Sequence, residues 1–222
     1  MRLIHQSTNA LELTKLMNTP CTEEKKRIIL GQETKMARQL ALIVLEKPEP
    51  PFWASFIPMV FVFYAQKLKQ YSSGLDEFAH NYMTLRRGAL ESAMAAKMTD
   101  SAVDVAKLLE NAGDMPPPAN PRYLRWIALL TDHYLLLLNS NGNCHATLVR
   151  SGYENKAAYL SFCACFIEAE QDFNLALLPG IEGEAQDLFE VVQKMNMGIA
   201  KLAYHEAEII FPPDTQALKP LP

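Results

Sequence analysis

Three glutamates lie where helical periodicity would otherwise place apolar side chains. When each segment is phased at about 100° per residue, Glu33, Glu170 and Glu206 fall inside the apolar stripes of three different predicted helices. A buried carboxylate without a partner is strongly unfavourable, so each group must be protonated, paired with a cation or bound to a metal ion. The sequence therefore predicts acidic side chains inside the fold.

One arginine and two histidines are placed to meet these carboxylates. Arg86 lies inside the apolar stripe of its own predicted helix, His133 flanks the stripe of another, and His205 lies at the edge of the face that carries Glu206. The simplest hypothesis is a buried ion network in which Arg86 pairs with one or two of the three carboxylates and fixes the register of the helices. A second interpretation is that some of the assumed phases are wrong and these groups face water.

A metal site is the alternative use of the same residues. A helical bundle with acidic core residues resembles the ferritin-like di-iron proteins, which use four carboxylates, two histidines and a Glu-x-x-His motif on each of two helices. This chain has one such motif, Glu77 to His80, and its phase faces it away from the apolar stripe. The resemblance is limited to architecture and acidic core residues. It implies iron or another transition metal, with the ligands Glu33, Glu170, Glu206 and either His133 or His205.

Residues 50–66 form an apolar segment without a charged side chain. The segment is apolar on every side of a helix, which is typical of a helix in the centre of a core or in lipid. Crossing a bilayer takes about 20 apolar residues, and this segment is shorter and contains Pro58. We expect a buried central helix, with an oligomer interface or a lipid-facing surface as alternatives. The aromatic residues that would form such an interaction surface are Trp53, Phe56, Phe61, Phe63 and Tyr64.

The preceding predicted helix also ends in apolar residues, at positions 40–45, so that the two helices form an apolar hairpin over about residues 40–64. Apolar patches larger than a few hundred Å² mark interaction sites when they are exposed. This hairpin favours a non-enzymatic binding protein that uses it for self-association, for a protein partner or for an apolar ligand. A homo-oligomer is expected, and peripheral contact with a membrane is the remaining option.

Helix-breaking and capping residues predict the fold class. Prolines, glycines and capping residues separate segments of helical periodicity, and we find no alternating β pattern. The expected fold is an all-α bundle of six to seven helices, several of them long and antiparallel, in one domain over residues 1–211, followed by a proline-containing tail at 212–222. The predicted helical segments, the short ones included, cover residues 22–47, 52–71, 75–98, 102–111, 121–138, 144–150, 153–178 and 184–211. Asp100 and Ser101 are expected to cap the short segment at 102–111.

The composition excludes several classes of function. The formal net charge is −4, which argues against a nucleic-acid partner because phosphate binding needs a basic surface. No apolar run follows the first residues, and the four cysteines lack the spacing of a disulfide framework, so we expect a soluble protein of the cytoplasm. Phosphate-binding, dinucleotide-binding, serine-hydrolase and zinc-protease motifs are absent.

Overall fold

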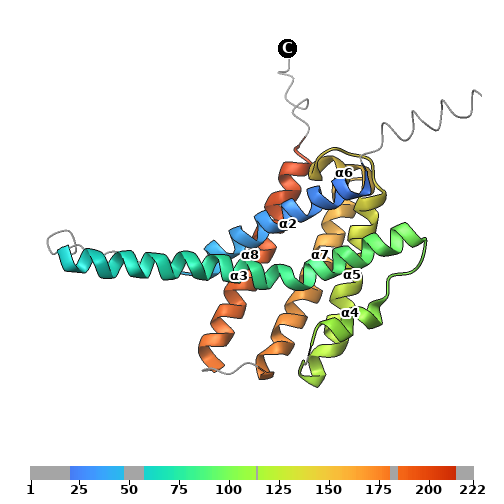
Figure 1. Ribbon diagram of the computed structural model, residues 1–222. Helices are drawn as coiled ribbons and strands as arrows, with labels where there is room; N and C mark the ends of the chain where they lie inside the picture. Colours follow the sequence, from blue (N-terminus) through green and yellow to red (C-terminus); the bar gives the residue numbers. More distant parts are fainter. Residues whose placement is uncertain (1–20, 48–57, 114, 181–184, 214–222) are drawn as a thin grey trace, which may run out of the picture.

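The computed structural model of the protein describes residues 21–47, 58–113, 115–180 and 185–213. Within these ranges the chain forms seven α-helices and two 3-10 turns, and it contains no strand, which confirms the all-α prediction (Figure 1). The helices are α2 (Thr22–Val44), α3 (Pro58–Thr99), α4 (Val105–Asn111), α5 (Asn120–Asn139), α6 (His145–Gly152), α7 (Lys156–Leu177) and α8 (Ala185–Ile210), and the 3-10 turns are η2 (Pro117–Ala119) and η3 (Leu178–Gly180).

Helix α5 is the central helix of the bundle. It packs against α2, α3, α4, α6 and α7, while α8 closes the other side by packing on α2 and α7. Apolar residues recur along α5 every three or four positions and are removed from solvent on almost every turn. These buried residues of α5 are Tyr123, Trp126, Ile127, Leu130, Tyr134, Leu137 and Leu138.

Helix α3 is one continuous helix of 42 residues, about 63 Å long at 1.5 Å per residue. The sequence predicted two helices here, separated at Ser72, Ser73 and Gly74, and that break is absent. A glycine costs a helix only about 1 kcal/mol relative to alanine, and serine costs less. This loss of helix stability is too small to end α3, because the turns after Gly74 continue into a part of the helix that is packed in the core.

Only the second part of α3 is packed into the bundle. No residue from Lys67 to Phe78 is buried, whereas from Ala79 onward buried residues recur at helical spacing up to Ala96. Figure 1 shows the first part of α3, in cyan, extending outward beyond the end of α2. We call residues 58–73 of α3 the arm. The expectation that residues 50–66 form a buried central helix concerns side chains that lie outside the described part of the chain, and among the described helices α5 takes the central position.

Several helix ends differ from the predicted ones for local reasons. The N-cap of α4 is Asp104, whose carboxylate accepts a hydrogen bond from the backbone N–H of Lys107 at 3.0 Å, rather than Asp100 and Ser101. Asp100 adopts a left-handed φ of 49°, which ends α3. The side chain of Asn155 caps α7 by accepting a hydrogen bond from the N–H of Ala158. Helix α7 therefore begins at Lys156 instead of the predicted residue 153.

Helices α2 and α8 approach closely at Gly198. A Cβ atom at this position would lie 2.7 Å from Leu40 Cδ1 and 3.2 Å from Ile43 Cγ2. Gly31 in the exposed middle of α2 is a matched control, because a Cβ there meets no atom within 4 Å. We expect Gly31→Ala to raise the free energy of unfolding by up to about 1 kcal/mol through helix propensity. Gly198→Ala should lose that gain and be destabilising by about 1–3 kcal/mol through overpacking.

Urea denaturation of the two alanine variants measures this difference. Equal stabilisation by both substitutions would contradict the close approach of α2 and α8.

Candidate functional site

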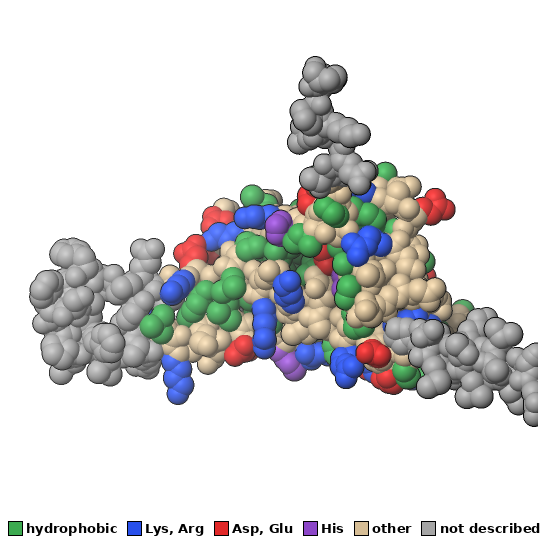
Figure 2. Space-filling model, turned by 90° about the horizontal axis from the view of Figure 1, so that it is seen from above, with side chains coloured by type: hydrophobic (Ala, Val, Ile, Leu, Met, Phe, Trp, Pro, Cys, Tyr) green, Lys and Arg blue, Asp and Glu red, His purple; other side chains and the backbone are tan. Residues whose placement is uncertain are grey.

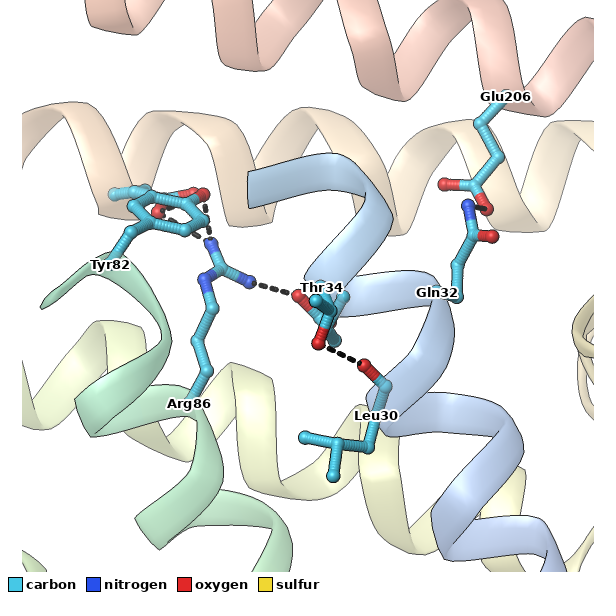
Figure 3. Close-up of polar contacts among 8 residues, drawn as sticks. Leu30, Gln32, Thr34, Tyr82, Arg86 and Glu206 are labelled. Carbon is cyan, nitrogen blue, oxygen red and sulfur yellow. Dashed lines mark hydrogen bonds and ion pairs between the residues drawn. The ribbon is translucent and has the colours of Figure 1, made fainter. Parts of the chain in front are cut away.

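Arg86 of α3 is the centre of a buried polar network that joins three helices. Its Nη1 donates to Oε2 of Glu33 on α2 at 3.1 Å, and its Nη2 donates to Oε1 of Glu170 on α7 at 2.5 Å. Tyr82, one turn earlier on α3, donates its hydroxyl to the same Glu170 oxygen at 2.9 Å. The side chains of Arg86 and Glu170 are each 3% exposed and that of Glu33 is 13% exposed. Figure 3 shows Arg86 reaching from α3 between Tyr82 and helix α2.

Aromatic rings surround the guanidinium group of Arg86. Its Cζ lies 4.5 Å from the ring centre of Tyr82, 5.4 Å from that of Phe166 and 5.7 Å from that of Trp126, within the range of cation–π attraction. Burial is the largest single influence on the pKa of Arg86 and lowers it, but Glu170, Tyr82 and Glu33 together outweigh burial, and the pKa lies well above its usual value. Arg86 is therefore a permanent cation. Burial also raises the pKa of the Tyr82 hydroxyl, so that this group remains a hydrogen-bond donor.

The network leaves polar atoms without partners. Two carboxylates, those of Glu33 and Glu170, face the single guanidinium of Arg86. Among the side chains that the structure describes, Glu170 Oε2 and Arg86 Nε are buried and have no hydrogen-bond partner. Buried polar atoms of this kind are rare in folded proteins and call for an explanation.

Glu206 belongs to a second polar group, at some distance from Arg86. Its Oε1 accepts a hydrogen bond from Gln32 Nε2 of α2 at 2.6 Å and lies 3.1 Å from His145 Nδ1 of α6. Figure 3 shows Gln32 and Glu206 meeting away from Arg86. The side chains of Glu206 and His145 are 13% and 15% exposed, more than those of Arg86 and Glu170.

His133 is a buried histidine on α5. Its Nδ1 lies 2.7 Å from the hydroxyl oxygen of Tyr153, and its ring stacks on Phe162 with centroids 4.5 Å apart. Burial, and secondarily the charges of His145 and Arg86, lower the pKa of His133 to about 3. The imidazole is thus neutral at physiological pH. His205, by contrast, is exposed on α8 and contacts neither polar group.

A cavity of about 50 Å³ connects the two polar groups and His133. Glu33, Tyr82, Arg86 and Glu170 line it at one end, and Gln32, His145 and Glu206 line it at the other. Apolar and aromatic side chains make up the rest of the wall, namely Met36, Leu130, Tyr159, Phe162, Cys163, Phe166, Ile167, Ile199 and Ala203. This cavity brings together most of the residues that the sequence analysis selected.

The structure places the selected residues in two groups, and Arg86 pairs with two of the three carboxylates, as the ion-network hypothesis allows. Arg86, Glu33 and Glu170 are in contact, but Glu206 pairs with Gln32 and His145 instead of Arg86. Glu77 and His80 are exposed, as their phase predicts. No group of three or more His, Cys, Asp or Glu side chains in the described part of the chain is arranged to hold a metal ion.

Sequence reasoning missed Gln32, Tyr82 and His145 as parts of the site. His145 is the first residue of α6, a helix of only eight residues, and a helix this short offers no periodicity from which an inward phase can be read. Tyr82 lies in the apolar stripe of α3 and reads there as an ordinary core residue. The position of Tyr82 four residues before Arg86 is the one signal that relates it to the network.

The apolar interaction surface of the sequence analysis falls largely outside the described residues. Trp53 and Phe56 lie outside them, and Phe61, Phe63 and Tyr64 lie in α3 where only the backbone is described. Nearby, Leu42 and Ile43 at the end of α2 are 59% and 37% exposed. Figure 2 shows hydrophobic side chains gathered with Lys and Arg side chains on the described surface beside the grey segment at the left. In the described helices, no segment has the length and the apolar character needed to cross a membrane.

The chain matches no family model, no curated protein and no solved structure.

Proposed function

We propose that the protein is a non-enzymatic helical interaction protein that attaches to a lipid surface through the tip of its arm. One observation carries this proposal: α3 leaves the bundle as a continuous helix, with no buried residue from Lys67 to Phe78. The arm therefore places the charge-free sequence of residues 58–66 at a distance from the core that α2, α5, α7 and α8 form (Figure 1).

A lipid surface fits this sequence better than a second copy of the chain does. Residues 50–66 are apolar on all sides of a helix, and a single partner helix would cover only one side. Lipid covers every side, and a segment too short to cross a bilayer can still enter its interface. Lys47, Lys67 and Lys69 flank the segment and are exposed, at positions where cations meet lipid headgroups.

Co-sedimentation with vesicles of phosphatidylcholine and phosphatidylserine tests the proposal. We expect the full-length protein to bind, and Phe61→Asp and Trp53→Asp to lower the vesicle partition coefficient at least about tenfold, because each removes roughly 1.5–3 kcal/mol of apolar burial and adds a charge. Phe189→Asp is the matched control, since Phe189 is an exposed aromatic residue on α8. It should bind as the unmodified protein does.

Two results would overturn the lipid assignment. One is a protein that stays in the supernatant at every vesicle concentration. The other is concentration-dependent assembly without lipid that Phe61→Asp abolishes, which would make a second copy of the chain the partner. Analytical ultracentrifugation measures this assembly.

Two further features of the function are proposals of the same kind. Self-association of the bundle is one of them. Location in a reducing compartment such as the cytoplasm is the other. It is supported by the four cysteines, Cys21, Cys144, Cys163 and Cys165, all of which are free thiols.

A further inference from the structure

We propose that the cavity beside Arg86 binds a small organic ammonium ion. The proposal goes beyond attachment to lipid, and the evidence for it is separate, because it comes from residues of the bundle and from none of the arm.

Charge is the first argument. At the inner end of the cavity, the carboxylates of Glu33 and Glu170 carry one formal negative charge more than Arg86 neutralises. No other titratable group of the cavity wall compensates this charge. His133 is neutral, His145 faces Glu206, and Tyr82, Tyr159 and Cys163 add no positive charge. An anionic ligand is therefore disfavoured, and a cation would complete the balance.

Hydrogen bonding is the second argument. Glu170 is only 2% exposed and lines the cavity, yet its Oε2 has no donor among the described residues. An ionised carboxylate accepts hydrogen bonds only, so the group that satisfies this oxygen must carry N–H or O–H bonds. An ammonium group supplies both the missing donor and the missing positive charge.

The wall of the cavity is the third argument, because it selects an organic cation over a hydrated metal ion. Phe162, Phe166 and Tyr159 present aromatic surface to the cavity, which favours an alkylammonium ion through cation–π attraction and apolar contact. No cluster of oxygen ligands for a bare metal ion occurs in the described part of the chain.

The volume limits the size of the ligand. A cavity of roughly 150 Å³ holds benzene, and one water needs about 10–15 Å³. The cavity here is about 50 Å³, so that it fits an ion of about two to four heavy atoms. Methylammonium and ethylammonium are of this size.

Isothermal titration of the full-length protein with methylammonium chloride tests the proposal. Methanol is the neutral control of the same shape, and potassium chloride is the control for charge and ionic strength. We expect saturable binding of methylammonium with one site per chain, and affinities for methanol and potassium that are at least about tenfold weaker.

Two substitutions locate the site. Glu170→Gln removes the charge while keeping the shape and should weaken methylammonium binding at least about tenfold. Glu168→Gln is the matched control on α7, because Glu168 is exposed and pairs with Arg125; it should bind normally. Ala203→Leu fills the cavity without touching the charges and should abolish binding, with circular dichroism verifying that the variant is folded.

The proposal would be overturned by the absence of saturable binding to the folded unmodified protein. It would also be overturned by potassium binding as tightly as methylammonium, or by full binding in Ala203→Leu. None of these results depends on vesicle binding, so that failure of the arm proposal and failure of this one are distinguishable.

Discussion

Arg86→Met is expected to lower the free energy of unfolding by about 3–5 kcal/mol. Arg86 is 3% exposed and pairs with two carboxylates that are largely removed from water. Methionine fills much of the same volume but leaves Glu33 and Glu170 facing each other without a cation. Urea denaturation followed by circular dichroism measures the loss, and Arg87→Met is the matched control because Arg87 is the exposed neighbour on the same helix. The control should change stability by less than about 0.5 kcal/mol.

A compensating variant separates the charge effect from the loss of packing. In the triple variant Arg86→Met, Glu33→Gln, Glu170→Gln, no charge is left in the network. Replacement of a buried ion group by neutral residues of similar volume is often neutral or stabilising, so most of the lost stability should return. A loss of less than about 1 kcal/mol in Arg86→Met, the range of an exposed ion pair, would show that water reaches the network.

Lowering the pH from 7.5 to 5 is expected to destabilise the protein by about 2 kcal/mol through His133 alone. Burial lowers the pKa of His133 to about 3 in the folded protein, whereas the unfolded chain takes up this proton near the usual histidine value of about 6.5. Between these two pKa values the unfolded state binds more protons. The contribution of His133 is therefore fully present above about pH 6.5 and is lost progressively as the pH falls toward 3.

The difference between the unmodified protein and His133→Gln measures this contribution, because glutamine does not titrate and can still pair with the Tyr153 hydroxyl. The free energy of unfolding is measured for both proteins at pH 7.5 and at pH 5. The change with pH in the unmodified protein, minus the change in His133→Gln, is the contribution of His133. All other ionisable groups are the same in both proteins, so their effects cancel in the comparison. Equal pH dependence of the two proteins would mean that His133 is accessible to water and protonates in the folded state.

Helical phase in the sequence carries much of the information about the cavity. The inward direction of Arg86, Glu33 and Glu170 follows from periodicity, because each of these residues recurs at helical spacing with apolar neighbours on the same face. In the structure their side chains meet. Helical phase shows on which face of its own helix a residue lies. It does not show which residue of a neighbouring helix lies at the same level. For that reason the sequence could not tell that Glu206 meets Gln32 and His145 instead of Arg86.

The remaining differences have similar local origins. His205 and Glu206 are adjacent on α8, so their side chains point about 100° apart around the helix axis. This difference leaves His205 exposed and places Glu206 in the cavity wall. The seven helices of the described residues fall within the predicted number. The division of α3 into two helices was wrong because Ser72 to Gly74 weaken a helix without ending it. The sequence also could not show which helix occupies the centre of the bundle. Helix α5 does so because it packs against five other helices, and such long-range contacts cannot be read from one segment of the sequence.

Helix α3 runs without a break from the arm to the residues that line the cavity. The helix that carries residues 58–73 outward also carries Tyr82 and Arg86, about two to four turns further along, and it passes the end of α2 where Leu45 approaches Gly74. A continuous helix that is held at this point would transmit a displacement of its outer end to its inner end, which packs on α2 and α5. Lipid binding at the arm and ligand binding in the cavity would then be thermodynamically linked. Each binding event would change the affinity of the other site by the same factor.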